Sequence, residues 1–270
     1  MKFKNLLEAV GIHKPTRRHH YFVDTISLDD GTSFQFARWL HPSEAKKQFS
    51  VNQINSFKAL ISEGDFCIDI GAHTGDSALP MAVAAGSSGT VLALEPNPFV
   101  YHVLEKTARS NTPQMNIITM MAAATEEEGP IEFEYSDSGY CNGGRHEGMN
   151  ALQHGHMFKL QVTGINLTQE LNAHYSDLLP NLKFIKIDAE GYDLFVIKSL
   201  AEIILEYRPF IKSEVFKRTD SDYRKELFSF FLENQYAVHL VEGDSAVKGQ
   251  PLTLSDIDIE PHYDILCSPC

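Results

Sequence analysis

Residues 66–75 read FCIDIGAHTG, and this stretch decides the fold class. The mostly apolar residues 66–70 predict a short buried strand, and Gly71 and Gly75 predict a tight turn directly after it. Residues 77–85 follow as a predicted helix that is rich in small and apolar side chains. A strand, a glycine turn and a helix in this order are typical of the first unit of a doubly wound α/β sheet.

The same alternation continues to the end of the chain. Further strands are predicted at residues 90–94, 116–120, 131–135, 181–188, 210–215, 236–241 and 263–267. Helices are predicted between them at residues 99–110, 194–206 and 223–233. Strands that alternate with helices of about ten or more residues imply βαβ units. We therefore expect a Rossmann-like α/β fold, with a mainly parallel sheet and helices on both faces.

Two segments lie outside this pattern. Residues 22–28 and 32–36 alternate between apolar and polar side chains around an Asp-Asp-Gly turn, which predicts a β-hairpin. We divide the chain into an N-terminal extension, 1–50, and a main domain, 51–270. Residues 136–156 are rich in Gly, Asn and His with little periodicity, and we expect this loop to close over a substrate.

Composition narrows the classes of partner. The 23 basic and 36 acidic residues give a net charge of −13 at pH 7, which disfavours a nucleic-acid partner because phosphate binding depends on Lys and Arg. Apolar runs are short and interrupted by charge, so no membrane span and no membrane partner are predicted. With no signal peptide and only four cysteines, we expect a cytoplasmic protein.

The glycine turn predicts a nucleotide-like ligand. Glu95 lies 20 residues after Gly75, at the end of the second strand, where a carboxylate can accept both ribose hydroxyls. Asp69 ends the first strand, where it suits a cationic group. The turn lacks the middle glycine of NAD sites and the Lys-Ser/Thr pair of phosphate-binding loops. S-adenosylmethionine, which has an ammonium, a carboxylate and a sulfonium but no phosphate, fits better.

A second motif lies at residues 185–191, IKIDAEG, where a strand ends and a helix begins. Asp188 and Glu190 have two interpretations there. They could stabilise the positive N-terminal end of the helix, or they could face the ligand crevice at the carboxyl edge of the sheet. The position at a strand end favours the second interpretation.

Three blocks together resemble the FkbM family of S-adenosylmethionine-dependent methyltransferases: residues 66–75, 93–98 (ALEPNP) and 185–191. The resemblance spans roughly residues 60–270. It implies a class I methyltransferase fold, with a seven-stranded sheet and one antiparallel strand near its edge. Relatives of this kind methylate hydroxyls on sugars, polyketides and related metabolites. Two positions depart from the family pattern, because His73 replaces the usual Asn and Asn166 replaces the start of a Thr-Leu-Asp motif.

The resemblance also implies which residues hold the cofactor. Contacts are expected first from Asp69, Gly71, Gly75 and Glu95. The wider expected set, drawn from the same blocks and a weaker match at 123–129, adds Ala72, His73, Asp76, Pro96, Asn97, Ala123 and Asp188.

Methyl transfer to a hydroxyl benefits from a base that removes the proton. We expect Asp188 to be that base or to orient the acceptor, with Glu190 and Glu214 in support. His146, His154 and His156 offer another base, or a divalent-metal site together with Asp188. Their spacing matches no defined ligand pattern, so no metal is predicted.

Three classes of function stay open. The first is an O-methyltransferase acting on a small molecule or glycan. The second is a methyltransferase acting on protein or nucleic acid, and the third is a S-adenosylmethionine-binding protein without catalysis. The sequence leaves the identity of the methyl acceptor open, and it is compatible with a homodimer.

Overall fold

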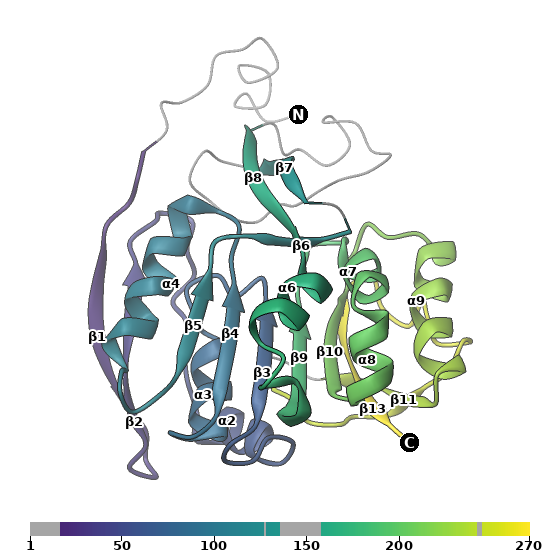
Figure 1. Ribbon diagram of the computed structural model, residues 1–270, viewed down its shortest axis with the longest axis horizontal. Helices are drawn as coiled ribbons and strands as arrows, with labels where there is room; N and C mark the ends of the chain where they lie inside the picture. Colours follow the sequence, from purple (N-terminus) through teal and green to yellow (C-terminus); the bar gives the residue numbers. More distant parts are fainter. Residues whose placement is uncertain (1–16, 127, 136–157, 242–244) are drawn as a thin grey trace.

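The computed structural model describes residues 17–126, 128–135, 158–241 and 245–270. Its centre is a single eight-stranded sheet (Figure 1). In spatial order the strands are β12 (Pro251–Leu252), β11 (Tyr236–Val241), β13 (Tyr263–Pro269), β10 (Phe210–Val215), β9 (Leu182–Ile187), β3 (Phe66–Ile70), β4 (Thr90–Leu94) and β5 (Ile117–Met120).

Strands β5, β4, β3, β9 and β10 are parallel, whereas β13 is antiparallel to both β10 and β11. The predicted class I methyltransferase fold is therefore confirmed, with its antiparallel strand inserted near one edge. The eighth strand, β12, has only two residues and extends that edge beyond β11. The sequence did not predict it.

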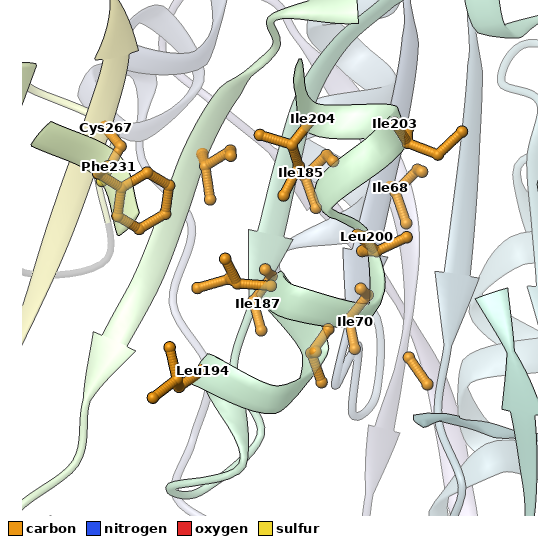
Figure 2. Close-up of a cluster of buried hydrophobic side chains, with 14 of the residues drawn as sticks. Ile68, Ile70, Ile185, Ile187, Leu194, Leu200, Ile203, Ile204, Phe231 and Cys267 are labelled. Carbon is orange, nitrogen blue, oxygen red and sulfur yellow. The ribbon is translucent and has the colours of Figure 1, made fainter. Parts of the chain in front are cut away.

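Helices cover both faces of the sheet, as predicted. One face carries α6 (Leu167–His174), α7 (Asp193–Ser199), α8 (Ala201–Tyr207) and α9 (Ser221–Glu233), with the 3-10 helix η1 (Leu179–Asn181) before β9. The other carries α2 (Val51–Lys58), α3 (Ala78–Ala85) and α4 (Pro98–Ser110). Side chains alternate along a strand, so Ile68 and Ile70 of β3 face α7 and α8 while Cys67 faces α2 and α3. Figure 2 shows the first of these two cores.

The helix predicted over residues 194–206 is broken into α7 and α8. Leu200 lies between them with ψ near 6°, outside the helical range, and its side chain is fully buried. The hydroxyl of Thr168 donates to the carbonyl of Ser199 at 2.7 Å, which satisfies an acceptor at the break. Tertiary packing thus overrides a helical pattern that is continuous in the sequence.

The predicted hairpin is present as β1 (Tyr21–Ser27) and β2 (Ser33–Trp39). Phe34 and Phe36 of β2 are buried in the core that α2 and α3 share. The backbone N–H of Ala37 also donates to Thr107 of α4 at 3.2 Å. The hairpin is therefore joined to the sheet domain by packing and by hydrogen bonds, and the division at residue 50 stays a prediction.

A second, three-stranded sheet lies above the carboxyl ends of the parallel strands (Figure 1). It consists of β6 (Ala123–Thr125), β8 (Phe158–Asn166) and β7 (Gly129–Tyr135). Only β7 was predicted, because β6 has three residues and its partner β8 lies about 40 residues further along the chain.

The expected lid loop, with His146, His154 and His156, lies outside the described residues. In the described parts, no helix is both long enough and apolar enough to cross a membrane.

Candidate active site

A cavity of about 330 Å³ lies at the carboxyl ends of the parallel strands. Its walls come from the loops after β3, β4 and β9, from the small sheet, and from the segment between β2 and α2. Eight of the predicted site residues line it: Gly71, His73, Asp76, Glu95, Pro96, Ala123, Asp188 and Glu190. Motifs that are far apart in the sequence therefore meet at one edge of the sheet.

The glycine turn brings two strand ends into close contact. Gly71 has φ of 80°, and a Cβ atom there would lie 2.1 Å from the carbonyl oxygen of Asp188. Only glycine allows this approach between the ends of β3 and β9. Gly75, with φ of 93°, packs against Thr107 and Leu104 of α4, so it shapes the turn from behind the cavity. Ala72 is likewise buried and does not line the cavity.

Glu95 is buried and is held by two backbone N–H groups. Asn97 donates to Oε1 at 2.8 Å, and His73 donates to Oε2 at 3.0 Å. Asn97 also caps α4 through its side chain and lies behind the cavity wall. Each carboxylate oxygen of Glu95 retains a second acceptor position, so the group can accept two hydroxyls of a ligand.

Asp69 does not line the cavity, although a ligand contact was expected of it. Its side chain is fully buried, accepts a 2.6 Å hydrogen bond from the hydroxyl of Ser77, and lies 3.5 Å from Nζ of Lys186. Lys186 also donates to Asp188 at 3.2 Å and to the carbonyl of Gly71 at 3.3 Å. Burial alone would lower the pKa of Lys186, but Asp188, Asp69 and Asp76 together raise it, so this amine stays charged.

Lys186 was not among the predicted site residues. A signal for it existed, because Lys186 and Asp188 are two apart at the end of a strand and two-residue spacing places side chains on one face. Glu44 and Lys47 were also missed. They precede α2, and nothing local indicates that this segment returns to the glycine turn.

The charged groups of the cavity wall fall into two sets. Among its described residues, three lysines pair with three aspartates at 2.9–3.2 Å: Lys47–Asp76 (2.9 Å), Lys186–Asp188 (3.2 Å) and Lys212–Asp264 (3.0 Å). Three glutamates of the same wall, Glu44, Glu95 and Glu190, form no ion pair with a lysine or arginine anywhere in the described chain.

Burial is the main reason why these three glutamates have raised pKa values. The pKa is about 7 for each of them. Repulsion from Asp188 adds to the rise at Glu190, and the two backbone N–H groups oppose it at Glu95. A carboxyl with a pKa near 7 can gain or lose a proton at physiological pH, so all three are candidates for binding or proton transfer.

Glu214 lies on β10 and does not line the cavity. Burial, followed by repulsion from Asp188 and Asp193, raises the pKa of Glu214 well above its usual value, which favours the protonated carboxyl. The neighbouring Asp193 is fully buried and accepts from the backbone N–H of Glu214 at 3.3 Å. The supporting role expected of Glu214 stays a prediction.

In the described part of the chain, no group of three or more His, Cys, Asp or Glu residues is arranged to hold a metal ion.

A model of the methyltransferase FkbM domain matches residues 69–238, well over half of the chain. The chain belongs to the FkbM methyltransferase family. S-adenosylmethionine is therefore its cofactor, as the sequence predicted. Among curated proteins, none matches the chain.

Solved structures resemble this FkbM domain at low identity. An FkbM methyltransferase from Methylobacillus flagellatus is 14% identical with a TM-score of 0.46, over 76% of this chain and 44% of that one. The chain thus spans less than half the length of that protein. Aeropyrum pernix fibrillarin with natively bound S-adenosyl-L-methionine is 12% identical with a TM-score of 0.42, over 93% and 96%. A S-adenosylmethionine-dependent O-methyltransferase from Thermotoga maritima is 12% identical with a TM-score of 0.42, over 91% and 77%.

The residues of the cavity fit S-adenosylmethionine. Glu95 retains one acceptor position on each oxygen, which suits the two ribose hydroxyls. Gly71 lets the backbone of Asp188 approach closely, so the ends of β3 and β9 form one continuous wall. No phosphate-binding arrangement is needed, and the carboxylates that outnumber the lysines along the described wall suit a cationic ligand.

Replacing Glu95 with Gln tests the ribose assignment. An amide has only one acceptor oxygen, so it cannot accept both backbone N–H groups and two hydroxyls. We expect the affinity for S-adenosylhomocysteine to fall by about 10- to 100-fold, measured by calorimetry. Glu233→Gln, at an exposed position on α9, is the matched control. An unchanged affinity in Glu95→Gln would exclude the ribose assignment.

Proposed function

We propose that this FkbM methyltransferase methylates a hydroxyl group of a small molecule or glycan, with Glu190 as the proton acceptor. The observation that carries the proposal is a glutamate on the cavity wall that forms no ion pair within 4 Å among the described residues and has a pKa of about 7, which burial and Asp188 raise and the charges of Lys217 and Arg218 lower. A base is most effective when its pKa lies near the working pH.

The lining and charge of the cavity support a small-molecule or glycan acceptor over a nucleic acid. Phe133 and Tyr135 of the small sheet add an aromatic surface to one wall. Six carboxyl groups against three lysines on the described wall would repel the phosphates of a nucleic acid.

The backbone at Glu190 supports a special role for this residue. Its φ is 52°, in the left-handed region, and Gly191 follows with φ of 98°. Residues other than glycine rarely adopt this conformation, and such strain concentrates at functional sites. The turn places Glu190 on the cavity wall, which Asp188 also lines.

The sequence indicated Asp188 as the base or as the group that orients the acceptor. Its ion pair with Lys186 favours the orienting role, because the ammonium holds one carboxylate oxygen in a fixed position. S-adenosylmethionine, when bound, supplies an electrophilic methyl group. Glu190 accepts the hydrogen bond of the acceptor hydroxyl and takes its proton as the new carbon–oxygen bond forms. The sulfur–methyl bond would break in the same step, with S-adenosylhomocysteine as the leaving group. Asp188 orients the acceptor by accepting a hydrogen bond from another polar group of it.

A methyl-transfer screen tests the proposed function. The protein is incubated with S-adenosylmethionine carrying a labelled methyl group and with four classes of acceptor: hydroxylated sugars, polyketides, peptides and nucleic acid. We expect label only in the first two classes, attached to oxygen. Label in peptide or nucleic acid would support the second function class instead, and binding of the cofactor without any transfer would support the third.

The pH dependence of turnover gives a further prediction. Glu190 must be unprotonated to accept a proton, so kcat should rise with pH through about 7 and then level off. Glu44 and Glu95 titrate in the same range and could affect binding, so the measurement uses a saturating cofactor concentration. In Glu190→Gln the residual rate should lose this rise. A wild-type profile that is flat between pH 5.5 and 8.5, a range on the order of one pH unit or more on each side of this pKa, would contradict the assignment.

A further inference from the structure

Glu44 brings a carboxyl to the cavity from outside the part of the chain that the family model matches. It lies between β2 and α2, whereas the matched residues begin at Asp69. Only 8% of its side chain is exposed, and it lines the cavity together with His73 and Asp76 of the glycine turn. A segment that the sequence assigned to the extension therefore forms part of the cavity wall.

The carboxyl of Glu44 has an unsatisfied oxygen. Oε1 is buried and has no hydrogen-bond partner among the described residues, and Oε2 lies 3.6 Å from Nε2 of His73. Burial lowers the pKa of His73 to about 4, so this imidazole is neutral and supplies no positive charge. Of the two lysines that follow in sequence, Lys46 is exposed and the ammonium of Lys47 is bound to Asp76 at 2.9 Å.

A buried carboxylate without a cationic or hydrogen-bonding partner is unfavourable. Burial raises the pKa of Glu44 to about 7, so a substantial fraction of the group is negatively charged at neutral pH. A cation that enters the cavity would be attracted to this carboxyl of its wall. The charge and the position of Glu44 therefore favour a positively charged ligand group.

His73 connects this carboxyl to the cofactor side of the cavity. The ring of His73 lies beside Glu44, while its backbone N–H donates to Glu95 at 3.0 Å. Glu44 and the expected ribose ligand Glu95 thus flank the same residue of the glycine turn. Glu190, in contrast, follows β9. The cation at Glu44 should accordingly belong to the cofactor and not to the methyl acceptor.

We propose that Glu44 binds the ammonium group in the amino-acid portion of S-adenosylmethionine. The inference rests on S-adenosylmethionine being the cofactor, as in the proposed function. It gives Glu44 the role that the sequence suggested for Asp69, whose carboxylate is already bound to Lys186 and Ser77 behind the wall.

Calorimetry with three ligands and the Glu44→Gln variant tests the proposal. S-adenosylhomocysteine has the amino-acid portion but no sulfonium, decarboxylated S-adenosylmethionine keeps the amine, and 5′-methylthioadenosine lacks the amino-acid portion. We expect Glu44→Gln to bind the first two about 10- to 100-fold more weakly. The affinity for 5′-methylthioadenosine should change by less than about threefold, which also shows that the variant has a folded cavity.

Glu233→Gln, exposed on α9, is the control and should leave all three affinities unchanged. If Glu44→Gln lost the same affinity for all three ligands, the proposal would be overturned, because equal losses would mean a general disturbance of the cavity. An unchanged affinity for S-adenosylhomocysteine would overturn it as well, while leaving the proposed function intact. If the wild-type protein bound none of the three ligands, the cofactor assignment and the inference would fail together.

Discussion

Replacing Glu190 with Gln is expected to lower kcat by about 10²- to 10⁴-fold, the usual contribution of a general base. Gln has the same shape but cannot accept the proton of the acceptor hydroxyl. The affinity for S-adenosylhomocysteine should stay within about threefold of the wild type, because Glu190 is assigned to the acceptor and not to the cofactor; a larger loss would place it in binding. Single-turnover rates with the acceptor identified by the screen provide the measurement.

The effect of Asp188→Asn should be compared with that of Glu190→Gln. Asn can still form a hydrogen bond with a hydroxyl, so we expect a smaller loss of about tenfold, mainly in KM. The reverse result, with Glu190→Gln nearly normal and Asp188→Asn inactive, would assign the base to Asp188, as the sequence alone suggested. Glu190→Asp should remain impaired, because a shorter side chain draws the carboxyl back from the cavity.

Replacing Lys186 with Met is expected to lower the free energy of unfolding by about 3–5 kcal/mol, because it removes the cation beside a buried carboxylate. Asp69 is fully buried, and Lys186 is its only cationic partner within 4 Å among the described residues. Urea unfolding at pH 7 provides the measurement. Lys198→Met is a suitable control, since the Lys198–Glu226 pair is largely exposed and should contribute less than about 1 kcal/mol.

A double variant separates the charge effect from the packing effect. If the buried charge of Asp69 causes the loss, Lys186→Met combined with Asp69→Asn should be more stable than Lys186→Met alone. Asp188 can tolerate the loss of the Lys186 ammonium because 45% of its own side chain is exposed to solvent. A Lys186→Met variant as stable as Lys198→Met would show that the Lys186–Asp69 contact contributes little.

Much of the sheet was predictable because it depends on local patterns. Apolar runs of about five residues, glycine turns and periodic helices identified β3, β4, β9, β10, α3, α4 and α9. The patterns were less reliable where tertiary contacts decide the outcome. Thr168 and the buried Leu200 interrupt an apparently continuous helix, and β6 forms only because β8 returns beside it.

The sequence by itself determined at which edge of the sheet the cofactor site lies. Gly71, Glu95 and Asp188 each follow a predicted strand, and parallel strands place their carboxyl ends at one edge of a sheet. Only the tertiary structure decided which carboxyl groups at that edge are neutralised. Lys186 pairs with Asp188 and approaches Asp69, while Lys47 pairs with Asp76 from a distant segment. Such pairs join residues that no local pattern connects. Only the folded chain shows that Glu44, Glu95 and Glu190 are the carboxyls of the wall that form no ion pair with a lysine or arginine of the described residues.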